Sequence, residues 1–133
     1  MMSQTGEYAI RAMSYMARRV DQLPVQSKEI ASETAIPSNY LSKILHTLVQ
    51  VGILTSTRGL HGGFRFAKPP EEIRLFDVVD PFDHLRNQKH CILGQPECDG
   101  KNPCALHEQW ASTQDSHMEF LENNSVAVGA CVP

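Results

Sequence analysis

SKEIASETAIPSNYLSKILHTL, residues 27–48, is the stretch of the chain that decides the fold. It predicts two short helices separated by a break at residues 35–37. Ser27 and Ser38 are suitable N-caps, because a serine hydroxyl can accept a hydrogen bond from an unpaired backbone N–H of the first helical turn. In the second helix four apolar residues recur at three- and four-residue steps, which predicts one buried face: Leu41, Ile44, Leu45 and Leu48.

The opposite face of the second helix is polar. Its side chains can donate or accept hydrogen bonds, and none of them would repel a phosphate. Two short helices of this kind are typical of a helix-turn-helix, whose second helix enters the major groove of DNA. The residues predicted to contact DNA from this helix are Ser38, Asn39, Tyr40, Ser42, Lys43 and His46.

The residues that follow predict a β-hairpin. Residues 53–58 and 64–67 are strand-like runs, and the glycine-rich segment 59–63 joins them. The tip gathers the basic side chains of Arg58, His61 and Arg65, which suit a DNA backbone or minor groove. This pattern indicates a winged helix. A hairpin used only for packing is the alternative, but packing gives no reason to collect cations at the tip.

Flanking segments complete a mainly α fold with a small β-hairpin wing. Residues 3–20 predict a first helix, Lys68-Pro-Pro70 ends the wing, and residues 71–79 predict a short or kinked helix ahead of Pro81. Asn102-Pro103 predicts the start of a long helix that runs to about residue 123. We expect three units: a winged helix-turn-helix at 1–80, a cysteine-bearing loop at 81–103, and a dimerisation helix with its tail at 104–133.

The long C-terminal helix carries only a partial apolar stripe, formed by Leu106, Trp110, Phe120 and Leu121. A complete winged helix leaves little for this stripe to pack against within one chain. We therefore expect the helix to pair with a second copy. A homodimer also matches the two half-sites that helix-turn-helix proteins usually bind.

Charge is divided unevenly along the chain. The net charge is −3, but residues 1–70 hold eight Lys/Arg and four Asp/Glu, whereas residues 71–133 hold four Lys/Arg and eleven Asp/Glu. A basic half suits phosphate contact at one end of the molecule. No apolar run approaches membrane-spanning length and the first residues do not resemble a signal peptide, so we expect a cytoplasmic protein.

Three cysteines and a histidine form the pattern Cys91-x6-Cys98-x5-Cys104-x2-His107. Without an export signal, metal ligation or redox chemistry is favoured over disulfides. Structural zinc sites usually use cysteine pairs two to four residues apart, whereas wider spacing in a loop favours an iron–sulfur cluster. Cys104 is also expected at a helix N-terminus, which favours its thiolate. No role is assigned to Cys131.

Three other interpretations of the cysteines remain open. The first is a zinc- or thiol-stabilised winged-helix interaction module that holds no cluster. The second is a set of three unconnected cysteines in a loop. The third is a Cys104/His107 nucleophile pair, but no third group to orient the histidine and no oxyanion site is evident, so an enzyme is not expected.

Taken together, the chain resembles the Rrf2 family of bacterial winged-helix transcription regulators, of the IscR/NsrR-like, cluster-binding type. The resemblance runs from about Tyr8 to Leu121. It is carried by residues 8–12 (YAIRA), the apolar helix 41–48, residues 58–65 (RGLHGGFR), residues 70–73 and 77–79, and the three loop cysteines. Leu60 in place of the usual wing proline, Pro81 and the tail after Asn124 depart from the family pattern.

The resemblance implies a homodimer, crossed through its long helices, that binds a roughly palindromic double-stranded DNA operator. It also implies a 2Fe–2S or 4Fe–4S cluster that controls DNA affinity, with Cys91, Cys98 and Cys104 as ligands. His107 matches one known position of the fourth ligand. Glu7, supplied by the partner subunit, matches another. Cluster loss or oxidation is then expected to shift the geometry of the two DNA-reading heads.

Overall fold

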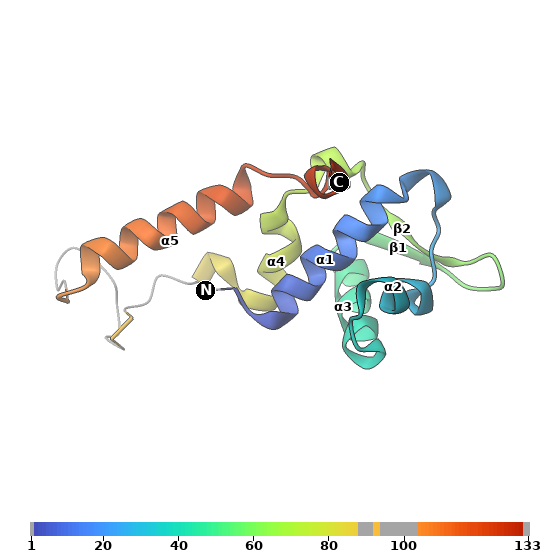
Figure 1. Ribbon diagram of the computed structural model, residues 1–133, viewed down its shortest axis with the longest axis horizontal. Coiled ribbons are helices and arrows are strands. Elements are labelled where there is room, and N and C mark those ends of the chain that lie inside the picture. The colour runs from blue at the N-terminus through green and yellow to red at the C-terminus, as the bar shows by residue number, and fades with distance from the viewer. Residues whose placement is uncertain (1, 88–91, 94–103, 132–133) are drawn as a thin grey trace.

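A computed structural model describes residues 2–87, 92–93 and 104–131 (Figure 1). Its described part is mainly helical with one two-stranded antiparallel hairpin, which confirms the predicted fold class. The helices are α1 (Gln4–Arg18), α2 (Ser27–Thr34), α3 (Ser38–Gln50), α4 (Leu75–Asp83) and α5 (His107–Glu122), and the strands are β1 (Leu54–Thr57) and β2 (Gly63–Phe66). Short 3₁₀ helices are η1 (Val20–Gln22), η2 (Pro70–Glu72), η3 (Leu85–Asn87) and η4 (Val126–Cys131). None of the described helices has the length and apolar character needed to cross a bilayer.

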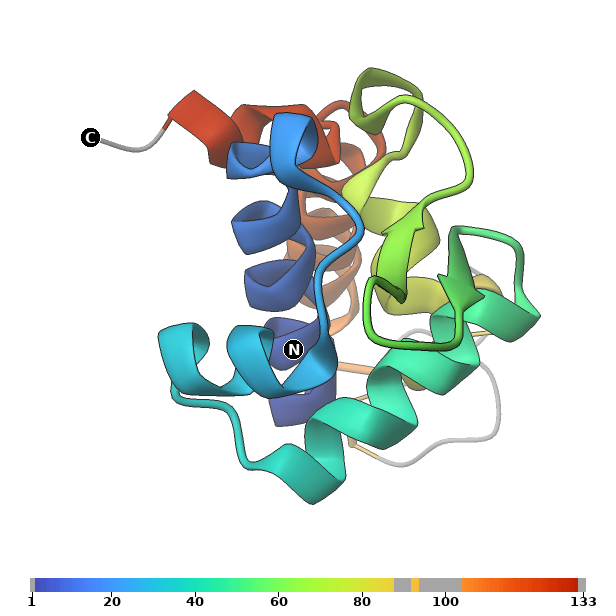
Figure 2. The same cartoon turned by 90° about the vertical axis from the view of Figure 1, so that its right-hand side faces the viewer.

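Helix α1 is the central element of the core and packs against α2, α3, α4 and η4 (Figures 1 and 2). Ser3 caps it, because the Ser3 hydroxyl accepts a 3.0 Å hydrogen bond from the Gly6 backbone N–H. The Ser3 backbone N–H in turn donates to the buried carboxylate of Asp83 on α4 at 3.0 Å. The apolar face of α1 is buried: Ala9, Ala12, Met13, Tyr15, Met16 and Ala17. The helix ends at Arg18, earlier than predicted, so Val20 lies in η1 and is exposed.

Helix α3 buries the four apolar residues that the sequence indicated, each of them at most 1% exposed. The predicted caps are wrong. Ser27 and Ser38 are the first helical residues, and the capping positions belong to Gln26 and Pro37, neither of which makes a side-chain cap hydrogen bond. The turn between α2 and α3 is instead fixed by its backbone. Ala35 is left-handed with φ +58°, and the Pro37 carbonyl accepts from the Leu41 N–H at 3.0 Å.

Strands β1 and β2 form the predicted wing in a register from Leu54 opposite Phe66 to Thr57 opposite Gly63. The base of the wing is joined to the segment before α2, because Val25 and Phe64 exchange backbone hydrogen bonds of 3.0 and 2.8 Å. Gly63 has φ +141°, and a Cβ there would lie 2.5 Å from the Val25 carbonyl oxygen. This close approach of two backbones requires glycine.

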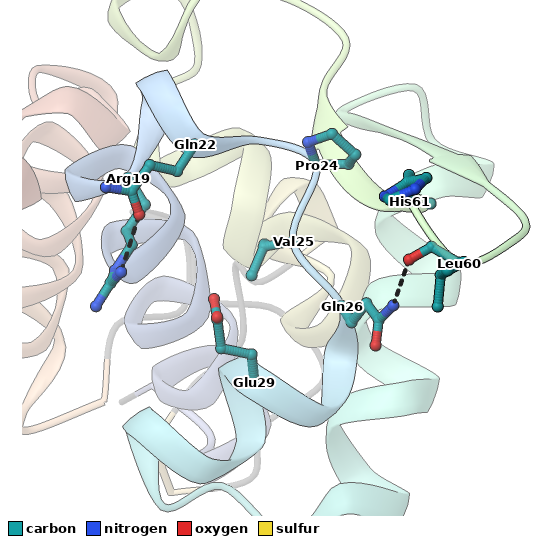
Figure 3. A pocket seen from close by; sticks show the side chains of 9 residues that line it. Arg19, Gln22, Pro24, Val25, Gln26, Glu29, Leu60 and His61 are labelled. Atoms are coloured by element: carbon teal, nitrogen blue, oxygen red, sulfur yellow. Dashed lines mark hydrogen bonds between the residues drawn. The ribbon is translucent and has the colours of Figure 1, made fainter.

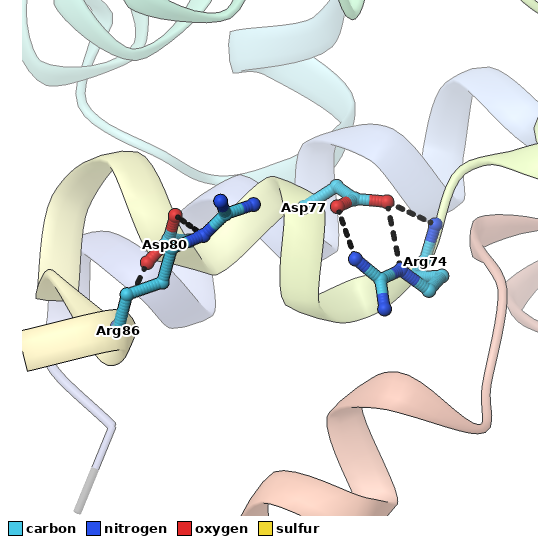
Figure 4. A network of polar contacts seen from close by, with 4 residues as sticks. All are labelled: Arg74, Asp77, Asp80 and Arg86. Atoms are coloured by element: carbon cyan, nitrogen blue, oxygen red, sulfur yellow. Dashed lines mark hydrogen bonds and ion pairs between the residues drawn. The ribbon is translucent and has the colours of Figure 1, made fainter. Parts of the chain in front are cut away.

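Helix α4 is fixed by charged side chains at both ends (Figure 4). Asp77 pairs with the Arg74 guanidinium at 3.0 Å and accepts from the Arg74 backbone N–H at 3.1 Å. Burial acts to raise the pKa of the Asp77 carboxyl, but the hydrogen bonds from Arg74 hold that pKa below its ordinary value. At the other end Arg86 pairs with Asp80 at 3.1 Å. The helix is short, as predicted, but it spans Leu75–Asp83 rather than residues 71–79, so Pro81 lies inside α4 and not after it.

The C-terminal part differs from prediction at the start of its long helix. Helix α5 begins at His107 rather than at Asn102-Pro103, and it extends away from the rest of the chain (Figure 1). The tail, for which the sequence made no prediction, packs along α1 through η4. Val126 is fully buried, and its N–H donates to the Ile73 carbonyl at 2.8 Å. A Cβ on Gly129 would lie 2.3 Å from the Ser14 hydroxyl oxygen, so the tail lies directly on α1.

Candidate nucleic-acid interface

Every residue that the sequence predicted to contact DNA is exposed. From α3 these are Ser38, Asn39, Tyr40, Ser42, Lys43 and His46, and from the wing they are Arg58, His61 and Arg65. Helix α3 and the wing are adjacent in the fold, since α3 runs directly into β1 (Figure 2). An exposed polar helix beside a basic hairpin is the arrangement that places a helix in the major groove and a wing on the flanking DNA.

Tyr40 has a contact that the sequence did not indicate. Its ring, 52% exposed, meets the ring of Tyr8 edge-on, with centroids 6.4 Å apart and planes inclined by 64°. The Arg11 guanidinium lies over the Tyr8 ring, 5.4 Å from its centroid. Gln4 donates to the Tyr8 hydroxyl at 3.0 Å. Helix α1 is thereby tied to the first turn of α3.

The last turns of α3 carry a second ordered pair. The Gln50 amide and the His46 ring nitrogen Nε2 lie 3.3 Å apart, one helical turn from each other. Both side chains are exposed. Either group can therefore present a donor or an acceptor toward a base edge or a phosphate.

The three basic residues of the wing are not equivalent. Arg58 and His61 belong to the exposed segment between the strands. Arg65 lies on β2, and its guanidinium donates to the Leu23 carbonyl oxygen at 3.3 Å. Arg65 thus also ties the wing to the connector before α2.

A recess of about 450 Å³ separates the wing tip from η1 and the start of α2 (Figure 3). Gln26 spans one side of it and donates to the Leu60 carbonyl oxygen at 3.4 Å. On the opposite side Arg19 donates to the Gln22 side-chain oxygen at 3.0 Å. At its floor Glu29 accepts from the Tyr15 hydroxyl at 3.0 Å, and burial together with this hydrogen bond raises the pKa of Tyr15.

The cysteine pattern falls partly outside the described residues, because Cys91 and Cys98 lie there. Cys104 is half-buried, forms no disulfide, and lies in the turn ahead of α5 rather than within the helix. His107, the first residue of α5, donates its backbone N–H to the Cys104 carbonyl at 3.1 Å. Glu7 is exposed on α1. Within the described part of one chain, no three His, Cys, Asp or Glu side chains come together as a metal site.

The family model of Rrf2, described as "Iron-dependent Transcriptional regulator", matches residues 2–128. The chain belongs to the Rrf2 family. A protein of Aquifex aeolicus assigned to the HTH-type transcriptional regulators is 32% identical over 126 residues, covering 93% of this chain and 87% of the relative. The HTH-type transcriptional regulator IscR of Aliivibrio salmonicida is 28% identical over 125 residues, covering 94% and 74% of the two chains.

The structure of CymR, the global cysteine regulator of B. subtilis, has the same fold as this Rrf2 chain. The two superpose with a TM-score of 0.82 at 21% identity, over 100% of this chain and 98% of CymR. These comparisons confirm the winged-helix fold and a DNA-binding role in transcription regulation. The named relatives are regulators rather than enzymes, as the sequence predicted.

Proposed function

We propose that this Rrf2 regulator is a homodimer whose operator affinity is controlled by an iron–sulfur cluster. The cluster is held by Cys91, Cys98, Cys104 and a fourth ligand. The observation that carries the proposal is the position of Cys104. Its thiol forms no disulfide and lies half-buried immediately ahead of α5, the helix that extends furthest from the DNA-reading head. Because its target is duplex DNA, we expect the protein to act in the cytoplasm.

DNA binding is divided between α3 and the wing. Lys43 and Arg58 supply positive charge for phosphates, while Asn39, Ser42 and His46 present hydrogen-bonding groups to base edges. We assign residues 1–80 to this unit, with the cysteine loop at 81–103 and the dimerisation helix and tail at 104–133. Helix α4 continues through Asp83, so the loop is attached to a rigid element of the head.

Dimerisation is supported by apolar side chains at α5 that remain exposed in the single chain. Leu121 is the fully buried residue of this helix, where it packs with Phe76, Val79 and Leu85. Leu106 and Phe120 remain 42% and 53% exposed. A second copy of α5 would cover these side chains and would place two DNA-reading heads in one molecule, which suits an operator with two half-sites.

The donor set fits an iron–sulfur cluster. Thiolates are the ligands that such clusters prefer, and the Cys104 thiol is available to act as one. When bound, the cluster supplies a redox-active iron centre whose ligation responds to iron, oxygen or nitric oxide. His107, one turn from Cys104, and the partner subunit's Glu7 are the two candidates for the fourth ligand, and neither nuclearity is favoured over the other.

Helix α1 offers a route between the two sites. Glu7, a candidate ligand, is adjacent to Tyr8, whose ring contacts Tyr40 in the DNA-reading helix. A ligand on α1 would therefore bias the position of α3 through one aromatic contact. Allosteric coupling of about 1–3 kcal/mol, roughly 5- to 150-fold in affinity, is typical of such systems.

The proposal is tested by anaerobic purification followed by absorption and Mössbauer spectroscopy with iron, zinc and acid-labile sulfide analysis. Coloured protein containing iron and sulfide is expected, and Cys104→Ser should lose both. His107→Ala and Glu7→Ala identify the fourth ligand by their altered spectra. Colourless protein that contains zinc and no sulfide would favour the alternative, a zinc- or thiol-stabilised winged-helix module without a cluster.

A further inference from the structure

The wing ends in an apolar side chain. Leu60 is 85% exposed, the highest value among the large apolar residues of the described chain. Its exposed neighbours along the chain are Arg58, which carries a guanidinium, and His61, which carries an imidazole. A leucine this exposed contributes little to the free energy of folding, and contact of its methyl groups with water is unfavourable. This position is therefore suited to contact another molecule.

The wing tip is a hydrogen-bonded turn. The Gly62 N–H donates to the Gly59 carbonyl at 3.0 Å, so Leu60 and His61 occupy the centre of a tight turn. Gly62 is pressed against the opposite strand, where a Cβ would lie 2.1 Å from the Thr57 carbonyl oxygen. Gln26 holds the Leu60 carbonyl from outside the wing. Leu60 is consequently presented by a braced turn and not by a freely moving loop.

We infer that Leu60 enters the minor groove of the bound DNA and disfavours base pairs that carry a purine 2-amino group. The inference rests on the proposed DNA contact of α3 and the wing, and it adds a sequence preference to that contact. The charges beside Leu60 indicate which kind of molecule this side chain contacts. Arg58 and His61 suit the two phosphate walls of a groove, and the apolar side chain between them suits its floor.

The preference follows from the chemistry of the groove floor. An A·T pair presents only acceptor atoms there, whereas a G·C pair adds the guanine 2-amino group, a donor that projects into the groove. Leucine has no acceptor for that N–H and competes with it for the same space. An amino group covered by Leu60 would lose its water and gain no partner, which should weaken binding by about tenfold.

The test varies the amino group without changing the major groove. A duplex is first selected from a random library by the full-length protein. At each position of that duplex inosine then replaces guanine, which removes the amino group, or 2,6-diaminopurine replaces adenine, which adds it. Dissociation constants are measured by fluorescence anisotropy at one fixed salt concentration for the wild type, Leu60→Ala and Leu60→Met. Val20→Ala, an exposed apolar residue of η1, is the matched control.

For the wild type, Leu60→Met and Val20→Ala, we expect one or two positions in each half-site at which added amino groups weaken binding by about tenfold. In Leu60→Ala these penalties should fall below about threefold, and the salt dependence should not change because no charge is lost. The inference is overturned if Leu60→Ala keeps the penalties, or if the wild type binds its duplex and shows none. Failure to select any duplex would instead contradict the DNA-binding function itself, and the inference with it.

Discussion

The ring of Tyr8 in α1 meets the ring of Tyr40 in α3 edge-on, at a centroid separation of 6.4 Å. This contact joins the helix that carries Glu7 to the helix that we propose to face DNA. Edge-to-face aromatic pairs contribute about 0.5–1.5 kcal/mol beyond the area they bury. The pair is therefore strong enough to influence where the first turn of α3 lies.

Replacing Tyr8 tests that influence. Tyr8→Leu should lower affinity for the selected duplex by roughly two- to tenfold, because Tyr40 loses the ring that positions it. Tyr8→Phe keeps the ring and should bind within about twofold of the wild type. Fluorescence anisotropy measures the dissociation constants of both variants for this duplex. Equal affinity of Tyr8→Leu and the wild type would show that α1 does not position the DNA-reading helix.

Removing the charge of Arg58 should weaken binding to all duplexes alike and lower the slope of log affinity against log salt by about one. The reason is that one phosphate contact, with its released counterion, is lost. Arg18→Ala removes an exposed cation from the last turn of α1, and its salt slope should stay that of the wild type. An unchanged slope for Arg58→Ala would count against the wing as a phosphate-binding element.

We expect the stability of the fold to depend on pH through His117 in α5. Its Nε2 atom is buried without a hydrogen-bond partner among the described residues, and burial lowers the pKa of the imidazole, while Asp83 acts in the opposite direction. A lowered pKa means that the unfolded chain takes up a proton first as the pH falls. Stability is therefore retained above the ordinary histidine value of about 6.5 and lost as the pH falls below it.

Thermal unfolding of the wild type should accordingly shift to lower temperature between about pH 7 and pH 5. His117→Leu should reduce that shift, because the group that titrates is gone. Protein concentration must be held constant, since the unfolding temperature of the proposed dimer would depend on it. If the variant and the wild type lose the same stability over this range, His117 is not responsible.

The tail should contribute measurably to stability. Val126 is fully buried against the core, so Val126→Ala should cost about 2 kcal/mol through lost burial and the cavity that remains. Val128 is 54% exposed in the same 3₁₀ helix, and Val128→Ala should cost less than about 0.5 kcal/mol. Chemical denaturation of both variants measures the difference. Two equal and small effects would mean that η4 adds little to the fold.

Periodicity alone was enough to predict the buried face of α3, and paired glycines with alternating apolar residues were enough to predict the wing. Both signals are local, because a helix repeats every three to four residues and a tight hairpin needs glycine at fixed places. The exposed candidates for DNA contact on α3 followed from the same periodicity, and those on the wing followed from its glycine-rich, basic tip. Those parts of the molecule could therefore be predicted from the sequence.

Other features were predicted wrongly or not at all, and two of them depend on contacts between distant segments. The serines at the starts of α2 and α3 have the right chemistry for caps, yet the capping positions lie one residue earlier, at Gln26 and Pro37. Nothing local in residues 125–131 reveals that Val126 will fill the core beside α1. The Tyr8–Tyr40 contact likewise exists only once α1 and α3 have packed together, and the start of α5 at His107 was not signalled by the proline at position 103.

The central claim is that the three loop cysteines control DNA affinity, and it is tested most directly by anaerobic titration of the selected duplex. The experiment compares three samples. They are wild-type protein with its iron and sulfide intact, the same protein after chelation, and the Cys91/Cys98/Cys104→Ser variant. The account predicts that the intact and chelated forms differ in affinity by at least about fivefold, and that the serine variant shows one affinity before and after chelation. Identical affinities of intact and chelated wild type, or a serine variant that still responds, would contradict it.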